Sequence, residues 1–107
     1  MYFSLIVLRS PNPDVLAAFY NKVGIAMTPE QHDDGPQHFA GSLGRSVLEI
    51  YPSKGQGATT ITFGLAVESI NVFRAAWLST GGRLGKHEQM VIDPDGNSVF
   101  IEEQSKW

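Results

Sequence analysis

The chain has 107 residues, and its 8 Lys and Arg against 11 Asp and Glu give a formal net charge of −3. This length suits one compact domain and is short for two independent ones. The 42% of hydrophobic and 18% of charged residues are ordinary for a globular protein and exclude a disordered chain. Because cysteine is absent, disulfide scaffolds, thiolate metal sites and thiol nucleophiles are excluded as well.

The distribution of apolar and basic residues argues against membrane and nucleic-acid partners. No apolar run approaches the ~20 residues that a bilayer-spanning helix needs. The eight basic residues are scattered rather than gathered into a stripe that could follow a duplex, so we expect no nucleic-acid partner. The opening run from Met1 to Leu8 lacks a basic leader and a small-residue cleavage site, and we therefore expect a cytoplasmic protein.

The first half of the chain predicts a strand, a helix and three more strands. Phe3 to Leu8 is a continuous apolar run of strand length. Asn12 can then cap a helix that Pro13 begins and Gly24 ends, with Val15, Leu16, Phe19, Tyr20 and Val23 on its apolar face. Three strands are expected at about 26–32, 37–43 and 46–51, followed by a linker at 52–58.

The same order of elements is predicted again in the second half. A strand at 60–67 precedes a helix at 69–80, with Trp77 on its inner face and Gly81 at its end. Strand-like segments follow at 83–92 and 98–102, divided by an Asp-Pro-Asp-Gly-Asn turn at 93–97 in which we expect Asp93 and Asp95 to be structural. An offset of 57 residues superimposes the two opening strands and places Gly24 on Gly81.

The repeat predicts an α+β fold in which one domain, residues 1–107, consists of two β-α-β-β-β units at about 1–52 and 59–104. The second unit is expected to be about six residues shorter, through a trimmed region between Gly82 and Met90.

Three segments carry a resemblance to a known family. They are Leu-Ala-Ala-Phe-Tyr at 16–20, Leu-Glu-Ile at 48–50 and, most specifically, Asp-Pro-Asp-Gly-Asn-Ser-Val-Phe-Ile-Glu at 93–102. Together with the repeat, they resemble the vicinal oxygen chelate superfamily of glyoxalase I, extradiol dioxygenases, metal-dependent fosfomycin resistance proteins and bleomycin resistance proteins. The resemblance implies that the two units form a cup-shaped mixed sheet with the helices on its outer face. It also implies a homodimer.

Alternation along the strands indicates which residues face into the cup, because successive strand side chains point to opposite faces. Leu5, Val7 and Arg9 share one face of the first strand, and Val47, Glu49 and Tyr51 share one face of the fourth. The residues that we expect to contact a ligand are Leu5, Val7, Arg9, Val47, Glu49, Tyr51, Thr62 and Phe100.

The resemblance also places the superfamily's four metal-ligand positions, which fall on Leu5, Glu49, Thr62 and Phe100. Only Glu49 is a competent ligand, and one carboxylate does not hold a catalytic ion in competition with water. We therefore expect no metal, no cofactor and no catalytic residue. Glu49 itself has two interpretations, an anchor for a cationic or hydrogen-bond-donating ligand or a structural ion pair with Arg9.

The three histidines are expected at the surface or the rim of the cup. His32 and His38 flank an Asp-Asp-Gly-Pro turn, where solvated polar residues are normal, although His38 could reach the cup from its strand. No pairing of a nucleophile with a base is visible in the sequence.

The function that the sequence favours is binding of a small organic molecule, cationic or aromatic, in a cup without a metal. One alternative is a metal-dependent lyase, isomerase or dioxygenase with relocated ligands, which needs donors around Glu49 from among His38, His87 and Glu102. Another is a non-catalytic interaction module whose cup is filled by side chains; the volume of the cavity distinguishes it from a binding protein.

Overall fold

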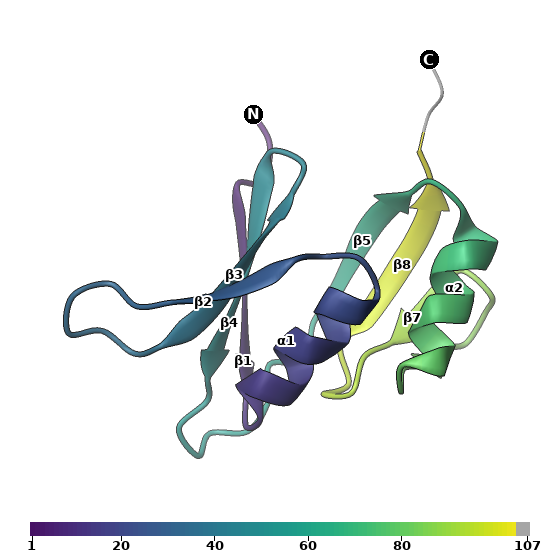
Figure 1. Cartoon of the computed structure of the whole chain (residues 1–107). Coiled ribbons are helices and arrows are strands. Elements are labelled where there is room, and N and C mark those ends of the chain that lie inside the picture. The colour runs from purple at the N-terminus through teal and green to yellow at the C-terminus, as the bar shows by residue number, and fades with distance from the viewer. Residues whose placement is uncertain (105–107) are drawn as a thin grey trace. The chain divides into compact units, whose positions relative to one another are not determined.

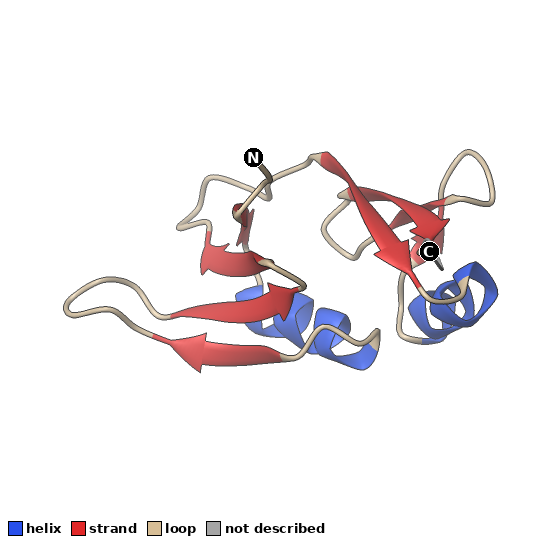
Figure 2. Cartoon of the chain, turned by 90° about the horizontal axis from the view of Figure 1, so that it is seen from above, coloured by secondary structure: helices blue, strands red, loops and turns tan. Residues whose placement is uncertain are grey.

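A computed structural model describes residues 1–104, and these form two compact units that divide between Thr59 and Thr60. Each unit has the order strand, helix, strand, strand, strand (Figure 1). Each unit has one helix, and Figure 2 colours the helices blue and the strands red. The α+β class and the two β-α-β-β-β units predicted from the sequence are therefore confirmed.

The first unit is a four-stranded sheet with a helix on one face. Its elements are β1 (Leu5–Ser10), α1 (Pro13–Lys22), β2 (Met27–Glu30), β3 (His38–Leu43) and β4 (Ser46–Pro52), and the strand order is β1-β4-β3-β2. The β1–β4 pair is parallel and the other two pairs are antiparallel. Helix α1 contacts all four strands, so one face of the sheet is covered and the other is left open.

The core of the first unit lies between α1 and the covered face. Leu16 and Tyr20 of the helix and Leu8, Leu48 and Ile50 of the strands are fully buried there. The residues next to them in each strand point to the open face, because successive strand side chains alternate between the two faces. Burial of this apolar layer, at roughly 25 cal/mol per Å² of apolar surface, is the main term that holds the helix to the sheet.

The second unit repeats this plan with shorter outer strands. Its elements are β5 (Thr62–Val67), α2 (Ile70–Ser79), β6 (Arg83–Leu84), β7 (Met90–Ile92) and β8 (Ser98–Glu103), in the strand order β5-β8-β7-β6. Trp77 of α2 is fully buried with Val91, Val99 and Ile101, and its indole N–H donates to the Ile92 carbonyl at 2.9 Å.

The predicted offset of 57 residues holds for the opening strand and the helix of the two units. It superimposes both ends of β1 on β5 and both ends of α1 on α2. Gly24 and Gly81 both have a φ of 113°, a conformation that side chains rarely adopt and that ends each helix. In each unit the backbone N–H that follows, from Ile25 or Gly82, donates to the carbonyl of the buried aromatic residue at 2.9 Å.

Several local predictions were wrong in detail. Strand β1 begins at Leu5 and leaves Phe3 85% exposed, because pairing with β4 starts only at Leu5 opposite Val47. Val15, predicted on the apolar face of α1, is 60% exposed, and Ala17 is buried instead. Asn12 occupies the N-cap position, but its side chain makes no capping hydrogen bond.

Neither described helix, α1 or α2, is long and apolar enough to cross a membrane.

The turn between β7 and β8 is organised by one buried carboxylate. Asp93 is fully buried and accepts hydrogen bonds at 2.9 Å from the backbone N–H groups of Asp95 and Asn97 and from the Asn97 side-chain amide. The Asn97 amide oxygen in turn accepts the Ile61 N–H, just before β5. Gly96, with a φ of 99°, permits the turn. The expected structural role of Asp93 is confirmed.

We expect Asp93→Ala to lower the free energy of unfolding by about 2–3 kcal/mol, because it leaves several buried donors without their acceptor. Urea denaturation followed by tryptophan fluorescence measures the change. Asp34→Ala, in an exposed turn of the first unit, is the matched control and should change stability little. Equal stability of the two variants would contradict a structural role for the buried carboxylate.

Candidate functional site

The open face of the first unit carries side chains in rows that run across its four strands. The polar row is formed by Glu30 of β2, His38 of β3, Tyr51 of β4 and Arg9 of β1: Glu30 pairs with His38, the His38 and Tyr51 rings stack, and Tyr51 pairs with Arg9. The next row contains Thr28, Ala40, Glu49 and Val7, and the third contains Ser42, Val47 and Leu5.

An open cavity of about 470 Å³ lies over this face. Most of the residues that line the cavity are small, so their side chains leave the space above the strands unfilled. The two long side chains on its wall are the carboxylates Glu30 and Glu49, of which 35% and 16% are exposed. The full lining comprises Ala26, Thr28, Glu30, Ala40, Gly41, Ser42, Val47 and Glu49.

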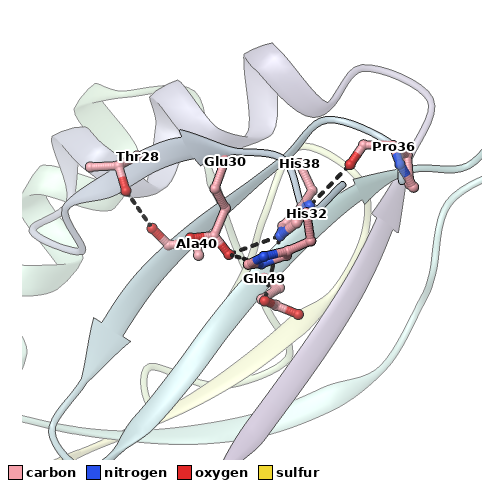
Figure 3. A network of polar contacts seen from close by, with 7 residues as sticks. All are labelled: Thr28, Glu30, His32, Pro36, His38, Ala40 and Glu49. Atoms are coloured by element: carbon pink, nitrogen blue, oxygen red, sulfur yellow. Dashed lines mark hydrogen bonds and ion pairs between the residues drawn. The ribbon is translucent and has the colours of Figure 1, made fainter. Parts of the chain in front are cut away.

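Glu30, which lines the cavity, forms a hydrogen-bonded cluster with two histidines (Figure 3). Glu30 Oε1 lies 2.9 Å from His38 Nε2 and 3.1 Å from His32 Nε2. His38 Nδ1 lies 3.2 Å from the Pro36 carbonyl, and the imidazole stacks on the Tyr51 ring at 4.2 Å between centroids. Glu49 Oε2 approaches His38 Nε2 to 3.6 Å.

The His38 imidazole is in an environment that favours its protonated form. Burial lowers the pKa of His38, but this effect is exceeded by hydrogen bonds to the Pro36 carbonyl and to Glu30 and by the charges of Glu49 and Glu30, so the pKa is raised above 6.5. The hydrogen bonds from His38 and then His32 lower the pKa of Glu30 below 4.5. The contact between His38 and Glu30 therefore favours the charged form of each side chain.

One expectation about the charged residues was wrong, and one of the two interpretations of Glu49 is not supported. His38 is not a surface residue, since it is 2% exposed, although His32 is exposed as expected. Among residues 1–104, the cation that pairs with Glu49 is His38 and not Arg9. The Arg9 guanidinium instead lies over the Tyr51 ring, 5.5 Å from its centroid, because Arg9 is opposite Tyr51 and not opposite Glu49 in the β1–β4 register.

The structure brings six of the predicted ligand-contacting residues onto this one open face. Val47 and Glu49 line the cavity; the other four, on the same face, are Leu5, Val7, Arg9 and Tyr51. Thr62 and Phe100 lie on the strands of the second unit, where Phe100 contacts the ring of His87 with 6.2 Å between centroids. His87 and Glu102 also belong to that unit, so within the first unit His38 is the predicted donor beside Glu49.

Sequence reasoning assigned no role to four residues of the cavity wall: Thr28, Glu30, Ala40 and Ser42. They come from the β2–β3 hairpin, whose connection spans residues 31–37. A connection of that length does not specify register, and a slip of one residue would turn Glu30 and His38 to the covered face. Alternation along each strand indicates that Thr28 and Glu30 share one face of β2 and that His38 and Ala40 share one face of β3. The observed pairing of the two strands is what places both pairs on the same face of the sheet.

We expect Glu30→Gln to lower the pKa of His38, because it removes a charge and weakens a hydrogen bond to the imidazolium. A raised folded-state pKa means that the His38 contribution to stability is complete below about pH 6.5 and is lost as the pH rises through the folded-state value. Side-chain NMR titration measures the pKa, and urea unfolding at about pH 6 and about pH 8 measures the loss. If the Glu30→Gln variant kept the wild-type pKa of His38 and lost the same stability between these two pH values, the ion pair between Glu30 and His38 would be contradicted.

Comparison with solved structures identifies the fold. A glyoxalase/bleomycin resistance protein from Albidiferax ferrireducens T118 is 21% identical, with a TM-score of 0.74 over 95% of this chain and 98% of that one. The antibiotic-binding protein TnmS3 from Streptomyces sp. CB03234 is 16% identical, with a TM-score of 0.74 over 98% and 97%. A lactoylglutathione lyase from Agrobacterium tumefaciens is 16% identical, with a TM-score of 0.72 over 99% and 96%.

No protein-family sequence model matches the chain, and no curated protein sequence matches it significantly. The structural similarity nevertheless extends over nearly the full length of both partners in each comparison, and it agrees with the repeat and with the closing motif at 93–102. The chain thus has the fold of the glyoxalase/bleomycin resistance proteins.

Proposed function

We propose that this protein binds a small organic molecule, cationic or aromatic, on the open face of its first unit. The observation that carries the proposal is the cavity of about 470 Å³ with Glu30 and Glu49 on its wall. This volume lies within the range of ~300–1,000 Å³ typical of small-molecule sites. It argues against the alternative of an interaction module whose binding face is filled by side chains.

The charge of the wall favours a cationic ligand. The lining contains two carboxylates and no Lys, Arg or His side chain. Glu30 is already engaged by two histidines, whereas His38 Nε2 lies 3.6 Å from Glu49 Oε2, which is longer than a good hydrogen bond. Glu49 therefore keeps acceptor capacity for a ligand, and we assign it the orienting role.

Affinity would come from burial of the ligand against the small apolar residues of the wall, with polar contacts at its margins. Ala40 and Val47 offer apolar surface, and the Thr28 and Ser42 hydroxyls offer hydrogen bonds. At the superfamily's metal positions Leu5 and Phe100 cannot coordinate an ion and Thr62 is a poor ligand, so the proposed binding does not depend on a metal there. An antibiotic-binding protein is among the solved structures with this fold, which is consistent with such a role.

We expect benzyltrimethylammonium to bind this face and to bind more tightly than benzenesulfonate, an anionic aromatic probe. NMR spectra of labelled protein in the presence of a metal chelator should show shifts clustered on Thr28, Ala40 and Glu49. Glu49→Gln should weaken binding of the cation about five- to tenfold, the effect of roughly 1–1.4 kcal/mol of lost electrostatic attraction.

Glu88→Gln is the matched control, because Glu88 is an exposed carboxylate of the second unit. It should leave the affinity for the cation unchanged. Tighter binding of the sulfonate, or shifts that lie outside the lining residues, would overturn the proposal.

A further inference from the structure

The cluster of Glu30, His32 and His38 brings three metal-ligand atoms close together. One donor atom from each residue lies within 4.8 Å of the other two. None of these residues occupies a position that the superfamily resemblance assigns to a metal, since those positions fall on β1, β4, β5 and β8. This cluster belongs instead to the β2–β3 hairpin.

The distances suit a small divalent ion. In a tetrahedral site with bonds of ~2.0–2.1 Å, neighbouring donor atoms are about 3.3 Å apart. Glu30 Oε1 is 2.9 Å from His38 Nε2 and 3.1 Å from His32 Nε2, so these two donor spacings are within about half an ångström of that value. His32 is 71% exposed at its side chain and can adjust freely.

The orientation of His38 matches that of a metal-bound histidine. The Pro36 carbonyl can only accept a hydrogen bond, so His38 Nδ1 must carry the proton in that contact, which we assign from the chemistry of the acceptor. His38 Nε2 then points at Glu30, and an ion can replace the proton that lies between His38 Nε2 and Glu30 Oε1. Metal-bound histidines commonly donate their second N–H to a carbonyl in this way.

The surroundings hold the His38 ligand in place before an ion arrives. The side chain is 1% exposed, and its ring is nearly parallel to that of Tyr51, with 6° between the planes. The ring therefore loses little further freedom on binding. Two nitrogens with one carboxylate oxygen suit Zn(II), Co(II) and Ni(II) and disfavour Ca(II) and Mg(II), which prefer oxygen donors.

We propose that Glu30, His32 and His38 form a binding site for one divalent transition-metal ion beside the first-unit cavity. The three side chains leave at least one coordination position for water or for an added ligand. Because Glu30 also lines the cavity, that position would lie beside the site of the proposed organic ligand. The metal site itself does not depend on the proposed function.

The test uses the full chain without a purification tag, treated with chelator and dialysed. Isothermal titration with Zn(II) should saturate at one ion per chain, and Co(II) should give visible absorption bands of a low-coordinate site. In long-range proton–nitrogen NMR spectra, Zn(II) should shift the Nε2 signals of His32 and His38 but not those of His87.

Two exposed histidines provide a matched pair of variants. His32→Ala should weaken Zn(II) binding at least tenfold, and His87→Ala should leave it unchanged. Glu30→Gln should also weaken binding at least tenfold, and unfolding curves confirm that it remains folded. The exposed His32 variant keeps the test valid if replacement of buried His38 prevents folding.

Absence of saturable Zn(II) binding would overturn the proposed metal site, as would binding that His32→Ala leaves intact. Binding that is lost in Glu49→Gln but kept in His32→Ala would place an ion elsewhere and overturn it as well. Because binding of benzyltrimethylammonium is measured in the presence of chelator, failure of the metal site and failure of the organic-ligand proposal are distinguishable.

Discussion

The first unit depends on one constraint: a single helix can cover only one face of a four-stranded sheet. The parallel pairing of β1 with β4 places Leu8 and Ile50 together beneath α1. The same pairing sends Val7 and Glu49 to the opposite face, since strand side chains alternate. Most of the residues that line the cavity on the uncovered face are small, whereas the covered face carries the apolar core of the unit. Folding and the proposed binding thus use alternate residues of the same strands.

The polar row on the open face shows how a buried histidine is accommodated there. His38 has lost nearly all contact with water, which would be costly if its nitrogens had no partners. A backbone carbonyl satisfies Nδ1, Glu30 satisfies Nε2, and Tyr51 covers the ring. At the β1 end of the row, the Arg9 guanidinium lies over the Tyr51 ring. Each member is placed by the strand beside it, so the row depends on the β2–β3 and β1–β4 registers together.

The two units share a framework but differ in the chemistry of their open faces. The position of Glu49 on β4 corresponds to Phe100 on β8, because each lies two residues after the partner of the first residue of the opening strand. The glycine that ends each helix and the buried aromatic residue that precedes it are retained in both. Residues that determine folding are therefore repeated, and residues that could contact a ligand have diverged between the units.

By itself, the sequence determined the order of the elements and the alternation along each strand. These depend on local patterns: apolar runs, Pro13 at a helix start, and Gly24 and Gly81 at helix ends. Glu49 could be predicted on the open face for the same reason. Only the tertiary structure decided that His38 is buried beside Glu30, because the seven residues between β2 and β3 leave the register of that hairpin unspecified. Local sequence patterns determine the strand and the face on which a residue lies, whereas the register between strands determines which residues it contacts.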